Sequence, residues 1–250
     1  MTSQDVTDKL ISLKDEQQGK ALMKFFKTAP GQYGYGDKFL GIKVPQTRAV
    51  AKEAIMLPIN EITSLLLSPW HEIRLCGFLI LVAKFEAAAK KSVINDEAAT
   101  ACRDEIVKLY LHYSTKANNW DLVDLSAPKI LGRWLLLPTS LGDKQTVVDK
   151  LAYSTDLWQQ RINMVCTLQT IQAGDSSWCL RYAEIHLNHP HDLMQKAVGW
   201  MLRELGKHVS MELLREFLRN HIHDMARTTL RYAIEKMPEQ ERIIWLKHNR

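Results

Sequence analysis

Helix-breaking residues recur at short intervals along this chain and leave only helix-length segments between them. Within the segments, apolar side chains such as Ile62, Leu65 and Leu66 repeat three or four residues apart, which is the spacing of one helix face. No run alternates β-branched with polar residues, as a half-buried strand would. The sequence therefore predicts about a dozen helices joined by short turns. The breakers lie at residues 30–36, Pro58, residues 68–69, residues 138–142, Gly174, residues 189–190 and Pro238.

A loose internal repeat appears when the turns are aligned. Five turn residues each precede, by six positions, a residue that we treat as equivalent, and they recur about every 30 to 50 residues, as in arrays of helical hairpins. The sequence thus predicts an all-α, HEAT-like helical-repeat solenoid that forms a single domain over residues 1–250, with a Gly-rich loop near residues 30–41. The pairs are Ser68 and Arg74, Asn118 and Asp124, Thr155 and Arg161, Pro190 and Lys196, and His221 and Arg227.

Four of the five equivalent positions are basic. Equivalent positions of a solenoid line up on one face, so these residues predict a basic concave cleft for a phosphate backbone. The formal net charge of +5 agrees with an anionic partner. Any single basic side chain of the row could equally well pair with an acidic side chain of the next repeat. The predicted DNA-binding residues are Arg74, Arg161, Lys196 and Arg227 of this row, with Lys129 and Arg203 on the same or adjacent helices.

The acidic exception in the row is Asp124. It follows Trp120 by four positions, so an indole and a carboxylate share one helix face. Together they can stabilise a cation, which suits a ligand that is anionic along its backbone and cationic at one point. Taken singly, Trp120 also fits a packing role, Asp124 fits an ion pair with Arg161, and Asp121 and Asn118 fit the start of the helix.

Cysteine and histidine usage argues against a metal, cofactor or membrane protein. The four cysteines form no CxxC pair and no signal-peptide h-region is present, so we expect reduced thiols and a cytoplasmic protein. The longest apolar run, residues 75–83, is too short to span a bilayer. His186, His189 and His191 suggest a solvated loop, with a metal site as the alternative.

Five segments in order resemble the signatures of the AlkD-like DNA alkylation repair glycosylases, and the likeness runs from about residue 20 to 235. They are GIKVPQTR at 41–48, HEIRL at 71–75, NNWDLVD at 118–124, WQQR at 158–161 and QKAVGWMLRE at 195–204.

The resemblance implies HEAT-like repeats that hold double-stranded DNA containing alkylated bases. It also implies excision of cationic 3-methyladenine and 7-methylguanine types without metal or other cofactor. Trp120 and Trp200 match the aromatic pair at the lesion, Asp124 the catalytic carboxylate, and Arg161 the cleft arginine near the lesion phosphate. Without the resemblance, Trp200 would be interpreted as a core residue. Phe25 stands where the family often has an aromatic hydroxyl.

From these features we expect a monomeric, monofunctional DNA glycosylase of base excision repair. Breaking the N-glycosidic bond leaves an oxocarbenium-like sugar, which a fixed carboxylate at Asp124 stabilises. The alternative is a non-catalytic HEAT-like protein that binds distorted or branched DNA, and a third possibility is a protein-binding scaffold. An acid within the basic row favours the enzyme, because a phosphate binder gains nothing from it.

Overall fold

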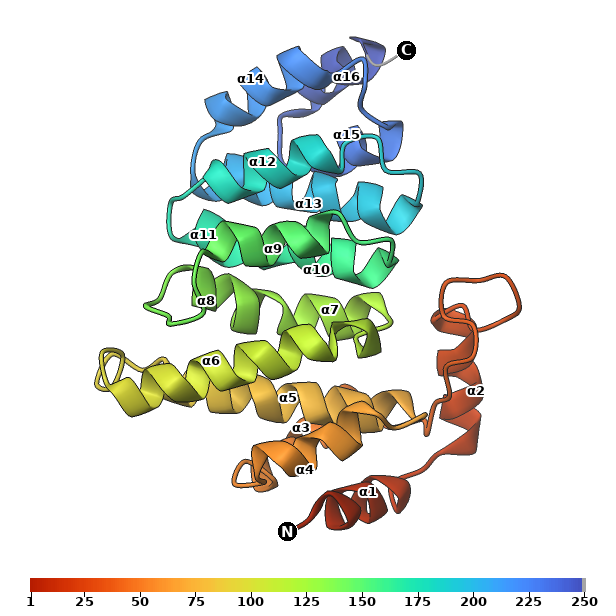
Figure 1. The fold of residues 1–250 in the computed structure, drawn as a ribbon. Helices are drawn as coiled ribbons and strands as arrows, with labels where there is room; N and C mark the ends of the chain where they lie inside the picture. The colour runs from red at the N-terminus through yellow and green to blue at the C-terminus, as the bar shows by residue number, and fades with distance from the viewer. Residues whose placement is uncertain (249–250) are drawn as a thin grey trace. The chain divides into compact units, whose positions relative to one another are not determined.

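The structure, a computed structural model, describes residues 1–248, and secondary structure over that range is helical (Figure 1). A lone bridge between Lys38 and Trp70 is the β pairing found there. The prediction of an all-α, helical-repeat fold is confirmed. The helices are α1 (Ser3–Ile11), α2 (Glu16–Phe25), α3 (Val44–Glu53), α4 (Ile59–Leu66), α5 (His71–Ala88), α6 (Glu97–His112), η1 (Ser114–Lys116), α7 (Trp120–Ser126), η2 (Pro128–Gly132), α8 (Arg133–Leu135), α9 (Lys144–Ala152), α10 (Leu157–Cys166), α11 (Leu168–Gln172), α12 (Ser177–Ile185), α13 (Asp192–His208), α14 (Met211–His221), α15 (Arg227–Ala233) and α16 (Glu239–His248).

Two compact units make up the chain. The N-terminal unit comprises Met1–Ser126 with Leu137–Ser140, and the C-terminal unit comprises Ala127–Leu136 with Leu141–Arg250. Each has its own buried apolar core, and each is described by itself below. The single domain over residues 1–250 stays a prediction.

Helix α5 is the centre of the N-terminal unit. Helices α3, α4, α6 and α7 pack against it, and Figure 1 shows it between α6 and the pair α3 and α4. Every residue of α5 from His71 to Val82 is buried. A helix that is apolar nearly all round must be covered on all sides, so this sequence commits α5 to the core.

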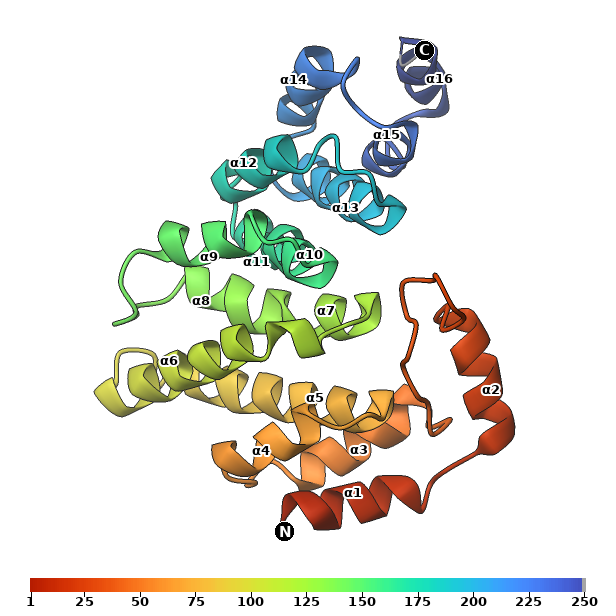
Figure 2. The same cartoon turned by 45° about the vertical axis from the view of Figure 1, so that its right-hand side comes forward.

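Helix α2 and the loop after it wrap the start of α5. Asp15 caps α2, which runs across the direction of α5 (Figures 1 and 2). The returning loop passes so close that a Cβ on Gly41 would lie 2.0 Å from the Asp15 carbonyl oxygen, and its φ of +89° also suits glycine. Glu72 of α5 then accepts backbone N–H bonds from Leu40, Gly41 and Ile42 at 2.9, 2.8 and 3.2 Å. The loop is therefore fixed to α5.

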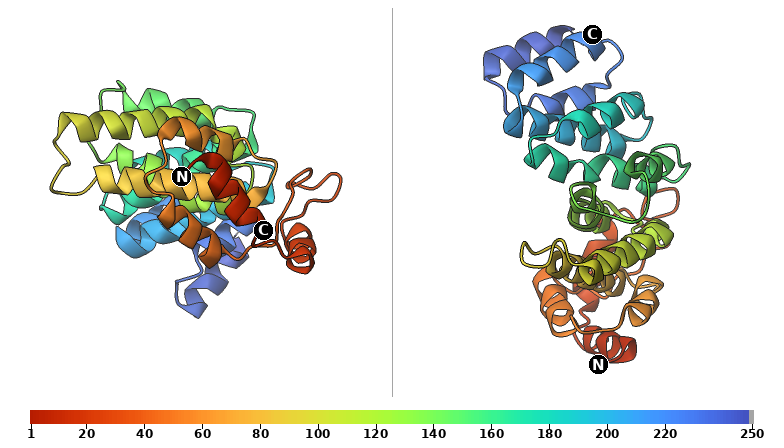
Figure 3. Two further views of the ribbon diagram at one scale, coloured as in Figure 1. Left: turned by 90° about the horizontal axis from the view of Figure 1, so that it is seen from below. Right: turned by 60° about the vertical axis from the view of Figure 1, so that its left-hand side comes forward.

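Helix α13 is the centre of the C-terminal unit, where α10, α11, α12, α14 and α15 pack against it. Figure 3 shows the helices of this unit, coloured from green to blue, from two further sides. Gly199 allows the approach of α15. A Cβ there would lie 2.4 Å from the Thr229 carbonyl oxygen and 2.5 Å from the Tyr232 Cβ. Small residues at such crossings let two helix backbones come close, so this contact depends on glycine.

The predicted breaks fall between helices. Pro58 is the N-cap of α4, and Gly174 joins α11 to α12 with φ of +90°. Several interruptions were not predicted, among them residues 12–15 between α1 and α2, residues 89–96 between α5 and α6, and the π-helical stretch Pro128–Gly132. Residues 89–96 contain no proline or glycine, so the strongest breaker signals are missing there.

Candidate functional site

Helix α7 carries two of the predicted catalytic residues. Trp120 is its first residue and Asp124 lies one turn later, so the two share a face, and both are half-buried. The Asn119 carbonyl oxygen accepts the Val123 N–H at 3.2 Å, so Asn119 rather than Asn118 precedes the first helical residue. The prediction for Asn118 was one position early because both residues are asparagine.

Two rings, Phe25 and Phe26, pack against the indole of Trp120. The ring centroid of Phe26 lies 5.4 Å from that of Trp120, and the edge-on ring of Phe25 lies 6.0 Å away. Phe26 in turn stacks on Phe39 at 5.1 Å. Phe25 is 60% exposed, whereas Phe26 and Phe39 are buried. Side chains from α2 and from the loop after it thus hold the tryptophan.

His71, the first residue of α5, is a buried cation in contact with Phe26 and Phe39. Its Nε2 lies 2.9 Å from Asp121 Oδ2, its Nδ1 lies 2.9 Å from Asp37 Oδ2, and its ring stacks on Phe39 at 4.4 Å. Each ring nitrogen faces a carboxylate oxygen, and only the doubly protonated ring donates a hydrogen bond to both. Burial acts to lower the pKa of His71, but Asp121 and then Asp37 outweigh it and raise the pKa to about 9.

Asp37 also binds Arg74. The guanidinium donates from Nη2 to Asp37 Oδ1 at 2.6 Å and from Nη1 to the Ser68 carbonyl at 2.9 Å. Burial acts to raise the pKa of Asp37, yet His71 and Arg74 hold it below its usual value. Contact of Arg74 with DNA phosphates stays a prediction. Arg74 is 4% exposed and occupied by internal acceptors, as the pairing alternative has it.

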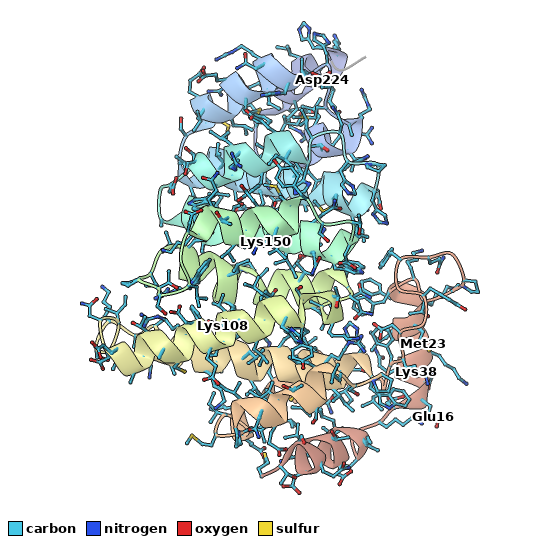
Figure 4. The ribbon with its side chains drawn as sticks, viewed as in Figure 1. Glu16, Met23, Lys38, Lys108, Lys150 and Asp224 are labelled. Carbon is cyan, nitrogen blue, oxygen red and sulfur yellow. The ribbon has the colours of Figure 1, made fainter. Side chains whose placement is uncertain are left out.

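A pocket of about 380 Å³ opens beside this network, between α2, the start of α3 and the start of α5. Phe25, Phe26, Phe39, His71 and Asp121 are among its lining residues. Figure 4 marks Met23 on α2 and Lys38 in the following loop, the two segments that bring its aromatic wall. The sequence carried no pocket signature, because the lining comes from four separate segments.

In the C-terminal unit, α13 carries Lys196 and Trp200 one turn apart. Trp200 is half-buried, and Lys196 pairs with Asp192 Oδ2 at 2.7 Å. Arg161 on α10 is 5% exposed, and its Nη1 donates to the Leu193 carbonyl at 2.5 Å. This contact ties α10 to the first turn of α13.

The other predicted cations of this unit also have internal contacts. Arg203 pairs with Glu204 at 2.8 Å and with Glu235. Arg227 is exposed and donates to the Leu246 carbonyl at 3.1 Å, and Lys129 is half-buried in the π-helical stretch. Contact of these residues with DNA stays a prediction.

The three clustered histidines have structural partners. His186 is buried with Nε2 2.9 Å from Asn163 Oδ1, and burial and then the neighbouring His189 lower its pKa to about 4. His191 accepts the Leu193 N–H at 3.1 Å as the cap of α13. The solvated-loop interpretation is wrong for His186. Within residues 1–248, no three His, Cys, Asp or Glu side chains gather as a metal site.

Asp37, Phe39 and the pairing role of Asp121 were missed from the sequence. His71 belongs to the HEIRL segment, but its partners lie 34 and 50 positions away in the chain. Asp121 lies in the first turn of its own helix, as expected, and its carboxylate also reaches α5. The signal that was available is the occurrence of histidine and arginine on one turn of an otherwise apolar helix.

Comparisons with known proteins bear on the whole chain. Residues 6–237 match the protein family described as DNA alkylation repair enzyme. A solved structure described as a predicted DNA alkylation repair enzyme from Enterococcus faecalis aligns with a TM-score of 0.67 at 18% identity, over 90% of this chain and 97% of that one. At that identity the likeness shows the fold. No curated protein matches the sequence. No helix among the described residues is long and apolar enough to cross a membrane.

Proposed function

This chain belongs to the DNA alkylation repair enzyme family, and from that premise we propose that it is a DNA glycosylase. Its substrates are cationic alkylated purines of the 3-methyladenine and 7-methylguanine type in duplex DNA. It hydrolyses their N-glycosidic bond and leaves an abasic site for base excision repair. The observation that carries this proposal is the pairing of Trp120 and Asp124 on one face of α7, half-buried against an aromatic cluster.

The chemistry follows from the charge of the lesion. Alkylation at N3 or N7 makes the purine cationic, so it departs as a neutral base and needs little help from a general acid. The bond between C1′ and the purine nitrogen breaks with its electron pair going to the base, and positive charge develops on the sugar. A water oxygen then bonds to C1′ and releases a proton. The products are the free base and an abasic site.

Asp124 is the residue that we assign to this charge. A carboxylate held near a developing oxocarbenium ion lowers the barrier by electrostatic stabilisation, most strongly where water is excluded. We assign to the same carboxylate the orientation of the attacking water and the acceptance of its proton. Half-burial of Asp124 supports this role, because it limits solvent screening while leaving the side chain accessible.

Trp120 and Trp200 are assigned to the lesion nucleotide. The face of an indole attracts cationic or electron-poor CH groups by about 0.5–2 kcal/mol per contact. Trp120 is supported by Phe25 and Phe26 and keeps part of its surface exposed. Selectivity would rest on the charge and lability of the lesion more than on reading the edge of the base.

Asp124→Asn tests the assignment. We expect the variant to lose release of 7-methylguanine from methylated duplex DNA while it binds that DNA as tightly as the wild type or more tightly. The asparagine keeps the size of the side chain, so the loss reports the charge. Release at the wild-type rate would show that Asp124 is structural and the mechanism is wrong.

A non-catalytic protein that binds distorted or branched DNA is the alternative. It predicts salt-sensitive DNA binding by the wild type with no base release from any alkylated substrate. Arg161→Ala separates phosphate contact from internal support in either case. We expect weaker DNA binding and a flatter dependence on salt, and an unchanged slope would confine Arg161 to its contact with Leu193.

A further inference from the structure

The first turn of α7 is joined to α5 by one charged contact. Asp121 lies between Trp120 and Asp124 in the chain, and its Oδ2 contacts Nε2 of His71. The other carboxylate oxygen, Oδ1, is buried and has no hydrogen-bond partner among the described residues. The buried charge of Asp121 therefore depends on His71 for its compensation.

A second route leads from His71 to the indole through aromatic rings. The imidazole contacts both Phe39, at 4.4 Å, and Phe26, at 5.1 Å. Phe26 then contacts Trp120 at 5.4 Å. His71 thus supports Trp120 through Phe26, and it restrains the helix at Asp121, the residue after Trp120.

We propose that His71 is a positioning residue, whose buried imidazolium fixes the first turn of α7 and so aims Trp120 and Asp124 at the alkylated nucleotide. This inference rests on the proposed glycosylase function. His71 acts on the reaction indirectly, through α7. It affects the orientation of Trp120 and Asp124 rather than bond breaking itself.

The charges around His71 explain why its proton matters. Asp121 faces it from α7 and Asp37 faces it from the loop after α2. The neighbouring Arg74 is engaged by Asp37 and Ser68, and Glu72 is engaged by three backbone N–H groups. Without its second proton, His71 turns a lone pair toward one of the two carboxylates. When that carboxylate is Asp121, its contact with His71 weakens and the first turn of α7 is released.

The test compares two variants across pH. His71→Gln removes the charge at every pH. Asp121→Asn leaves Asp37 as the carboxylate in contact with His71, so a lower pH is needed to keep the ring protonated. We measure single-turnover release of 3-methyladenine from duplex DNA between about pH 6 and pH 9, with spontaneous release subtracted. His112→Gln, an exposed histidine of α6 in the same unit, is the matched control.

We expect His71→Gln to release base at least about tenfold more slowly at every pH, because small misplacements of catalytic groups are costly. Asp121→Asn should approach the wild-type rate near pH 6 and fall to the His71→Gln rate near pH 8.5. Rescue at low pH is the result that a merely structural role would not produce. Asp121→Asn rates that stay low at every pH, or His71→Gln rates equal to the wild type, would overturn the proposal.

A readout independent of catalysis separates this proposal from the glycosylase assignment. The fluorescence of Trp120 is obtained as the difference between each protein and the same protein carrying Trp120→Phe. We expect it to change with pH in the wild type, at a lower pH in Asp121→Asn, and not at all in His71→Gln. If the wild type releases no base but these shifts occur, the proposed function fails while His71 still positions α7. If the shifts are absent, His71 does not position it.

Discussion

Asp121 Oδ2 lies 2.9 Å from Nε2 of His71, whose side chain is 2% exposed, so an ion pair links helices α5 and α7 within the core of the N-terminal unit. Burying one ion pair costs desolvation energy that the pair alone often fails to recover. Here a second carboxylate, Asp37, and the ring faces of Phe26 and Phe39 add to the attraction. The site therefore keeps a charged histidine at neutral pH.

This charge state makes stability depend on pH. The pKa of His71 is raised to about 9 in the folded protein from an ordinary value of 6.5, so the folded state holds the proton more tightly. The stabilisation, at most about 3 kcal/mol, is complete below about pH 6.5 and is lost as pH rises toward 9. Urea unfolding of wild type and His71→Gln at several pH values checks this. The same change of unfolding free energy with pH in the two proteins would contradict it.

Adjacent phenylalanines on the aromatic cluster should differ sharply in their effect on stability. Phe26→Ala removes a buried ring that contacts Phe39, His71 and Trp120, and we expect a loss of about 3–5 kcal/mol. Phe25→Ala, the matched control, removes a ring that is 60% exposed and should cost less than about 1 kcal/mol. Chemical denaturation of both variants decides the matter. Similar losses would mean that Phe26 does not support the cluster.

Two glycines of α13 provide a test of close packing. A Cβ at Gly199 would meet the Thr229 backbone oxygen at 2.4 Å, and backbone cannot easily move aside. We expect Gly199→Ala to destabilise the C-terminal unit by about 1–3 kcal/mol through overpacking. At Gly206 the nearest atom, 2.7 Å away, is the flexible end of Leu214, so Gly206→Ala should cost less. The reverse order in thermal unfolding would contradict the crossing of α13 and α15.

The four thiols should react in two stages. Burial raises the pKa of Cys76 and of Cys179 to about 12 and raises that of Cys166 as well, so few thiolates form. Cys102 is half-buried, and burial, with Glu105, raises its pKa to a lesser degree. With a disulfide reagent at about pH 8, we expect one thiol to react in the folded protein and three more on denaturation. Rapid reaction of all four in the folded state would rule out this core.

Local sequence was sufficient for most of the helices and for one half of the candidate site. Apolar periodicity and breakers such as Pro58 and Gly174 specify where helices begin and end, because these effects act over a few residues. The four-residue spacing of Trp120 and Asp124 likewise places them on one face of a helix without any further information. Segment resemblance then led to the family that residues 6–237 match.

Only the tertiary structure decided which charges are buried partners. Arg74 and Arg161 look alike in a repeat alignment. In the structure Arg74 donates hydrogen bonds to Asp37 and Ser68. Arg161 donates to the carbonyl of Leu193. The same is true of His71, whose charge comes from Asp37 and Asp121, 34 and 50 residues away. A sequence fixes the type and local spacing of side chains, whereas burial and electrostatic pairing arise when packing brings distant segments within a few ångströms and excludes water.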